Sequence, residues 1–62
     1  MCEANVYREK EGREELLMES VHILKPEGEK ILLQNIFGEQ RLVKGRLKLL
    51  DFTQDKIVIE ER

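Results

Sequence analysis

The stretch that decides the fold is residues 25–51, KPEGEKILLQNIFGEQRLVKGRLKLLD. It contains two runs in which apolar and polar residues are interspersed, 30–36 and 40–51, separated by Phe37-Gly38-Glu39. Apolar residues alternate within these runs, and alternation with period 2 is typical of strands with one buried face. A glycine at the break indicates a turn. The stretch therefore predicts two neighbouring antiparallel strands.

Two further signals lie in the same stretch. Lys44-Gly45-Arg46 places a glycine inside a strand, which predicts a bulge or a sharp bend. Lys25-Pro26-Glu27-Gly28 has proline early and glycine late, which is the order found in type I and type II turns. A third strand is therefore expected to end before this turn.

The same pattern continues on both sides, at Leu16 and Met18 and at Ile57 and Ile59. Turn signals at Glu11-Gly12 and Thr53-Gln54-Asp55 separate these runs from their neighbours. An alternative for residues 11–18 is a helix, because several residues there have good helix propensity. The predicted strands are 2–8, 13–24 with a bend near Ser20, 30–36, 40–51 and 56–61.

Five short strands in 62 residues are too few for two full sheets. They suit an all-β fold, a small and strongly bent antiparallel barrel that forms one domain over residues 1–62. A chain of this length buries only about 60% of the surface that its unfolded form exposes. Such domains usually need a disulfide, a metal or a partner chain, and one cysteine cannot form an internal disulfide.

The composition narrows the function classes. Eleven basic and 13 acidic side chains give a net charge of −2, which is not the basic surface of a nucleic-acid-binding protein. No apolar run approaches the roughly 20 residues that span a bilayer, and we expect no signal peptide. A free thiol without a signal indicates a reducing, cytoplasmic environment.

Cys2 is the residue most able to carry chemistry. If Met1 is removed, the amine and the thiolate of Cys2 can form a five-membered chelate ring. If Met1 stays, the Met1 amine, the Cys2 amide nitrogen and the Cys2 thiolate can form two fused rings. Planar nitrogen and sulfur donors suit Ni(II), with Cu(II) as a competitor. The alternative is that Cys2 is a small apolar strand residue, because it shares parity with Ala4 and Val6.

Other candidates are weaker. His22 lies between two apolar β-branched residues and is expected at the rim of the barrel. The many carboxylates are expected to be a solvated surface, since a barrel of this size has little room for an enclosed acid–base site. Tyr7 and the strand Lys44–Lys48, in which Lys44, Arg46 and Lys48 share a face, could contact RNA. Protection of a strand edge by basic side chains is the other interpretation of that strand.

Four segments together resemble the CooT family. They are Met1-Cys2-x-Ala4-x-Val6, Lys25-Pro26-Glu27-Gly28, Ile36-Phe37-Gly38-Glu39 and Ile57-Val58-Ile59-Glu60. The resemblance implies a dimeric barrel of the Src-homology-3 (SH3-like) type that handles nickel for carbon monoxide dehydrogenase maturation, with Cys2 as the metal ligand. The family also carries the label of a predicted RNA-binding protein, which rests on fold analogy.

The sequence is thus interpreted as a cytoplasmic nickel-binding accessory protein, not an enzyme, in which one Ni(II) is shared by two copies of Cys2 in a homodimer. A nickel enzyme such as carbon monoxide dehydrogenase, or one of its maturation factors, is the expected partner. The alternatives are an RNA-binding module and a structural interaction domain. Candidates for the dimer contact are Leu32, Ile36, Phe37 and Leu42.

Overall fold

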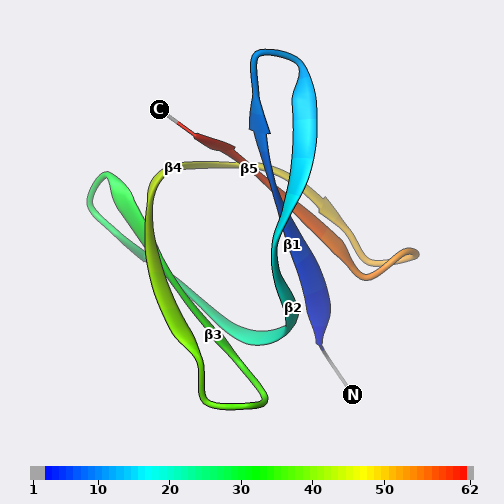
Figure 1. Cartoon of the computed structure of the whole chain (residues 1–62), viewed down its shortest axis with the longest axis vertical. Helices are drawn as coiled ribbons and strands as arrows, with labels where there is room; N and C mark the ends of the chain where they lie inside the picture. Colours follow the sequence, from blue (N-terminus) through cyan, green and yellow to red (C-terminus); the bar gives the residue numbers. More distant parts are fainter. Residues whose placement is uncertain (1–2, 62) are drawn as a thin grey trace.

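Residues 3–61 are described by a computed structural model, in which five strands form a closed barrel (Figure 1). Within that range the regular elements are all strands, so the helix considered for residues 11–18 is not formed and Glu11-Gly12 is a turn. The all-β prediction is confirmed. The strands are β1 (Ala4–Lys10), β2 (Arg13–Glu27), β3 (Lys30–Asn35), β4 (Gln40–Asp51) and β5 (Lys56–Glu61).

Each strand pairs with the next along the chain, and β1 pairs with β5 to close the barrel. The four consecutive pairs are antiparallel, as predicted, whereas the closing pair is parallel. An up-and-down path with an odd number of strands returns to its start in the same direction. The parallel pair therefore follows from the strand count.

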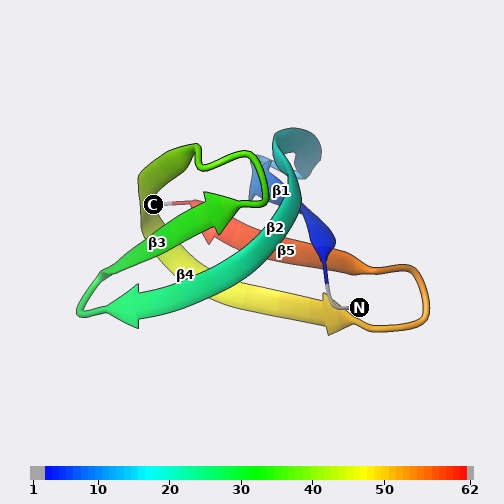
Figure 2. The same cartoon turned by 90° about the horizontal axis from the view of Figure 1, so that it is seen from below.

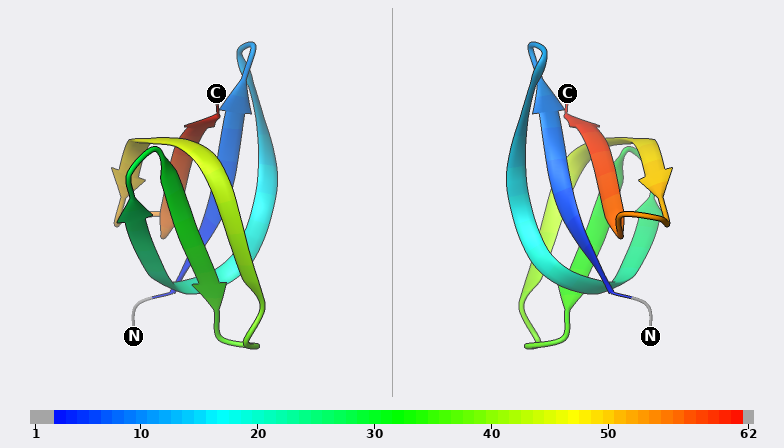
Figure 3. Two further views of the ribbon diagram at one scale, coloured as in Figure 1. Left: turned by 90° about the vertical axis from the view of Figure 1, so that its left-hand side faces the viewer. Right: turned by 90° about the vertical axis from the view of Figure 1, so that its right-hand side faces the viewer.

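The two long strands, β2 and β4, each serve two partners in succession, and they wrap around the barrel (Figure 3). β2 pairs with β1 up to Val21 and with β3 from Val21 onward, and Ser20 at this bend has a positive φ of 56°. β4 pairs with β3 up to Lys44 and with β5 from Gly45 onward. The bends predicted near Ser20 and at Gly45 are both confirmed.

Gly45 is required by the close approach of two backbones. A Cβ at this position would overlap the carbonyl oxygen of Glu60 and lie 3.1 Å from the Cα of Glu61. The Gly45 amide also donates to the carbonyl of Glu29 at 3.1 Å. The bend of β4 is therefore held between β5 and the β2–β3 turn, with no space for a side chain.

The turn predicted over Lys25–Gly28 lies further along the chain. β2 continues through Pro26 to Glu27, which is opposite Lys30, so the turn consists of Gly28 and Glu29. Pro26 is opposite Ile31 in the half of β2 that no longer pairs with β1. A proline is tolerated in a strand at an edge that forms no hydrogen bonds with a neighbouring strand. The prediction of a turn at Pro26 was therefore wrong.

The core is small. Its buried cluster consists of Val6, Val21, Ile31, Leu33, Val43 and Ile59, drawn from all five strands. Large apolar side chains remain exposed on the described surface, most of all Phe52 at 82% and Phe37 at 72%. A barrel of this kind depends on few apolar contacts, so backbone geometry at the bends has a large share in its stability.

The loop between β4 and β5 is organised by Asp51. Its Oδ1 accepts hydrogen bonds from the Thr53 hydroxyl at 2.6 Å, the Thr53 amide at 3.0 Å and the Gln54 amide at 3.3 Å. The Thr53 hydroxyl, with the two amides, lowers the pKa of Asp51. The Asn5 amide donates to the Asp55 carbonyl at 2.9 Å and joins the loop to β1. The turn predicted at Thr53-Gln54-Asp55 is thus confirmed.

Replacement of Gly45 by alanine is expected to destabilise the fold by about 2 kcal/mol or more, because the new Cβ meets backbone that cannot move aside. Urea unfolding monitored by circular dichroism at one fixed protein concentration measures this change. Lys44→Ala is the matched control, since Lys44 is exposed, and its effect should stay within about 0.5 kcal/mol. Equal stability of the two variants would contradict the close-approach explanation.

The hydrogen bonds at Asp51 predict a dependence of stability on pH. Because its pKa is lower in the folded state, the ionised carboxylate stabilises the fold above the ordinary aspartate pKa, and this contribution is lost as the pH falls through the folded-state value. The stability difference between wild type and Asp51→Asn should therefore be larger at neutral pH than in strong acid. Thr53→Val should reproduce part of the effect, since it removes the main donor. Carbon-detected NMR titration measures the pKa of the Asp51 carboxyl directly. A pKa at or above the ordinary aspartate value would refute the explanation.

Candidate functional site

The predicted ligand, Cys2, lies outside the described residues. Glu3 is the first residue that the structure describes, and Ala4 begins β1 opposite Val21 at the bend of β2. The first residue of β1 is therefore attached to the part of the barrel where β2 changes partner. The surroundings of Glu3 are the part of the site that can be examined directly.

A groove of about 300 Å³ lies beside Glu3. It is formed by the start of β1, the bend of β2 and the loop between β4 and β5, which lies close to the start of β1 (Figure 2). Its apolar side chains include Ile23, which is 41% exposed, and Phe52 at the rim. The lining residues are Glu3, Ala4, Val21, His22, Ile23, Leu24, Asp51, Phe52, Asp55, Lys56 and Ile57.

His22 is an exposed residue of β2 in this groove, as expected for a histidine at the barrel rim. Acidic side chains lie around it, but among residues 3–61 no three His, Cys, Asp or Glu side chains come together as a metal-binding group. Asp51 is already an acceptor for its own loop. The described side chains therefore do not form a closed metal cage of the kind that holds structural zinc.

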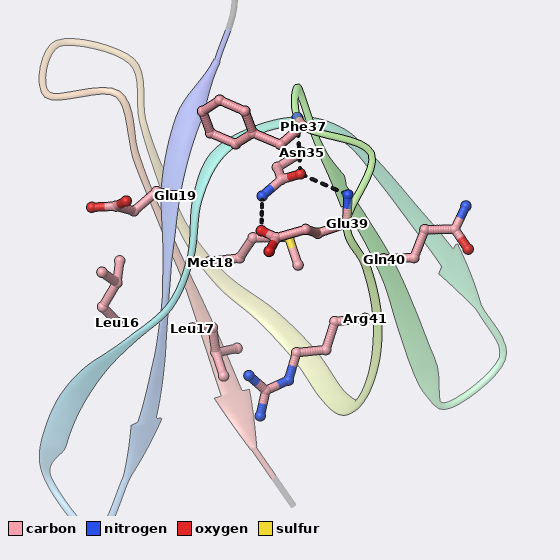
Figure 4. Close-up of a pocket in the computed structure, with 9 residues that line it drawn as sticks. All are labelled: Leu16, Leu17, Met18, Glu19, Asn35, Phe37, Glu39, Gln40 and Arg41. Atoms are coloured by element: carbon pink, nitrogen blue, oxygen red, sulfur yellow. Dashed lines mark hydrogen bonds between the residues drawn. The ribbon is translucent and has the colours of Figure 1, made fainter.

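A second cavity, of about 430 Å³, lies between β2 and the β3–β4 turn (Figure 4). Asn35, which is 2% exposed, organises this turn: its Oδ1 accepts from the amides of Phe37 at 3.1 Å and Glu39 at 2.9 Å. Its Nδ2 donates to Glu39 Oε1 at 2.6 Å. Arg41 and Glu19 also line the cavity (Figure 4).

Asn35 was not singled out from the sequence, although asparagine two residues before a Phe-Gly pair is a signal for a side chain that closes a turn on the backbone. Its amide oxygen and nitrogen both have partners inside the protein. Asn35 is therefore a structural residue that positions the turn, rather than a group that points at a ligand.

The residues considered for RNA are engaged with the protein itself. Tyr7 lies opposite Leu16 and Val58, and Val58 is 1% exposed although it is outside the core cluster. The Lys56 ammonium lies 5.2 Å from the centre of the Tyr7 ring. Tyr7 is thus part of an apolar row on the barrel wall and not an open stacking platform.

Two basic side chains of the strand Lys44–Lys48 are paired with carboxylates of the protein itself. Arg46 pairs with Glu60 at 3.0 Å, and Lys48 pairs with Glu9, whose hydrogen bond raises the pKa of Lys48. Lys44 belongs to the part of β4 that pairs with β3, before the bend at Gly45. The three cations therefore do not form one continuous basic surface, which favours edge protection over phosphate binding.

Within residues 3–61 the structure has no helix of the length and apolarity that a membrane span requires.

Comparison with known proteins assigns the family. The family model for CooT, described as "CO dehydrogenase accessory protein CooT", matches residues 1–60. A protein of Methanocaldococcus jannaschii is 35% identical over 60 residues, which is 97% of this chain and 98% of that protein. A crystal structure assigned to CooT of Carboxydothermus hydrogenoformans is 36% identical, covers 98% of both chains and superimposes with a TM-score of 0.91. The family predicted from the four sequence segments is confirmed, and this chain belongs to the CooT family of CO dehydrogenase accessory proteins.

Proposed function

We propose that this protein binds Ni(II) and delivers it for the maturation of carbon monoxide dehydrogenase, with Cys2 as the metal ligand. The observation that carries the proposal is the family match over residues 1–60, which spans Cys2 and names an accessory protein of that enzyme. Nickel is the cargo of such a protein and not a resident cofactor. The protein has a carrier role and no catalytic one.

The donor chemistry supports nickel. A cysteine next to the chain start offers a thiolate together with backbone and terminal nitrogens, and this planar set suits a d⁸ ion better than an ion with tetrahedral preference. The described side chains contribute no rival cluster of ligands within residues 3–61. Metal bound by this protein is therefore expected to depend on Cys2.

The site we propose is open and suited to exchange. One chain provides one thiolate, whereas a two-fold pair of chains provides two, so a homodimer would complete the ligand set. A ligand at a chain start can release its metal more easily than a closed cage. The thiol must stay reduced to act in this way, which places the proposed function in the cytoplasm.

Replacement of Cys2 by serine is expected to abolish stoichiometric Ni(II) binding and to leave the fold unchanged, because the first described strand begins at Ala4. Titration of the wild type with Ni(II) should produce thiolate-to-nickel charge-transfer absorption, which the serine variant should lack. Zn(II) should bind the wild type more weakly. Both proteins need an authentic N-terminus, since a tag there would replace the amine donor.

His22→Gln is the matched control for this test, since His22 lines the groove beside Glu3 and its imidazole is the single histidine nitrogen donor of the sequence. The control should keep its nickel stoichiometry and its charge-transfer band. Tight nickel binding by the serine variant, or its loss in the glutamine variant alone, would assign the metal to a different ligand.

A further inference from the structure

We propose that the outer face of β3 and of the first half of β4 is a docking surface for an acidic segment of a partner protein, one that carries an apolar side chain beside its carboxylates. This docking face consists of Lys30, Leu32, Leu42 and Lys44. It includes neither the chain start nor the groove beside Glu3, so the inference goes beyond the proposed function and does not rest on it.

The strand register places the four side chains together on the outside of the barrel. Lys30 is opposite Lys44, and Leu32 is opposite Leu42. Side chains two residues apart on a strand point to the same side, and Ile31, between the two on β3, is buried in the core. The docking face therefore points outward. It lies on the strands that are farthest from β1 around the ring (Figure 3).

Lys30 and Lys44 form a cross-strand pair of like charge. Within residues 3–61 neither ammonium group has an ion pair with a carboxylate. Glu27, which is opposite Lys30 on β2, pairs with Lys25 instead, at 3.9 Å, and Glu29 has an interaction of its own. Like charges directly opposite each other on neighbouring strands destabilise a sheet. A carboxylate from a partner would relieve this repulsion.

Protection of a strand edge does not account for both lysines. Such protection is needed where the backbone groups of a strand have no neighbour to pair with. Lys44 is on β4, whose first half pairs with β3 alone, and edge protection applies there. Lys30 is on β3, which has β2 on one side and β4 on the other. The second charge on this central strand therefore requires a different explanation, which an acidic partner provides.

The two leucines favour a protein as the partner over a nucleic acid. Leu42 is 51% exposed and lies opposite the half-buried Leu32, so apolar surface adjoins the lysine pair. A phosphate backbone would neutralise the lysines and leave this apolar surface uncovered. The three aromatic side chains, on which bases could stack, lie elsewhere, on β1 and in two turns.

The spacing of the two pairs specifies the segment that would fit. Lys30 and Leu32 are two residues apart, so the lysine pair and the leucine pair are separated by about 7 Å along the strands. An extended segment has the same spacing between alternate side chains. A segment with one residue between an apolar and an acidic side chain can therefore cover the leucines and reach the lysines at once. Charge complementarity of this kind fixes register and speeds association.

A synthetic peptide with this spacing, acetyl-Leu-Ser-Leu-Ser-Glu-Ser-Glu-amide, is the probe. In an NMR titration at about 20 mM salt, the amide signals of Lys30, Leu32, Leu42 and Lys44 should shift, with a dissociation constant below about 1 mM. The chain has a net charge of −2, so general attraction does not explain binding of an acidic peptide. Peptides with both Glu changed to Gln, or both Leu changed to Ser, should each bind at least about 10-fold more weakly.

Variants of the protein test the lysine pair. Lys30→Gln and Lys44→Gln should each weaken peptide binding at least about fivefold. Lys10→Gln is the matched control, with an effect below about twofold, because Lys10 is an exposed cation beside the β1–β2 turn without an ion pair to any residue of the described range. Lys44→Glu should abolish binding and raise the urea midpoint of unfolding, because it replaces a like-charge pair by an opposite-charge pair. A stabilised variant cannot have lost binding by unfolding.

Several outcomes would overturn the proposal. They are the absence of peptide-induced shifts at the docking face, equal binding of the Gln peptide, and equal weakening by Lys10→Gln. Shifts at the docking face when the protein alone is diluted would assign the face to a second copy of the chain. Shifts there with single-stranded oligouridine, but none with the acidic peptide, would assign it to a nucleic acid.

Discussion

The contact between the backbones of β4 and β5 at Gly45 is the constraint on which the barrel depends. A chain of 62 residues closes a five-stranded ring only because β2 and β4 each serve two partners, and each must turn sharply where it changes from one to the other. At β2 the turn is made by Ser20 in a left-handed conformation. At β4 it is made by the absence of a side chain, which lets the strand cross directly against the Glu60 carbonyl.

The successive pairing of β2 and β4 with two partners also explains where the surface has recesses. On both sides of its bend, each long strand pairs with a neighbour along one edge only, so both halves of the strand leave an unpaired edge. The cavity beside Phe37 involves residues of β2 before the bend and the first residues of β4, and the groove beside Phe52 involves residues of β2 after the bend and the last residue of β4. Both recesses thus arise from the strand bends, and both are flanked by a turn that a side-chain amide or carboxylate holds, Asn35 in one and Asp51 in the other.

Much of this fold could be predicted from local signals. Alternation identified all five strands, and Gly45 marked one bend, because the close approach of two backbones restricts residue choice at that position. The bend predicted near Ser20 was also found, and Ser20 there has a positive φ. The turn predicted at Pro26 was wrong, because the effect of a proline depends on whether a neighbouring strand is present. That is a property of the assembled barrel and not of the local sequence. The pairing of Arg46 and Lys48 with Glu60 and Glu9 could not be foreseen for the same reason, and it favours edge protection as the interpretation of that strand. The role of Cys2 stays a prediction, since that residue lies outside the described part of the chain.

The parallel closure of the barrel has a practical meaning for how the two chain ends can be used. Asn5 lies opposite Lys56 and Glu9 opposite Glu60, so β1 starts at the end of the barrel where β5 starts, and β5 finishes at the far end. An affinity tag or a fused carrier domain attached after β5 would therefore leave from the pole opposite the groove beside Glu3. A circularly permuted version would need a linker between the end of β5 and the start of β1. That linker must run the length of a strand, because the two ends lie at opposite poles of the barrel. A two-residue connection of the kind found between β1 and β2 cannot span this distance.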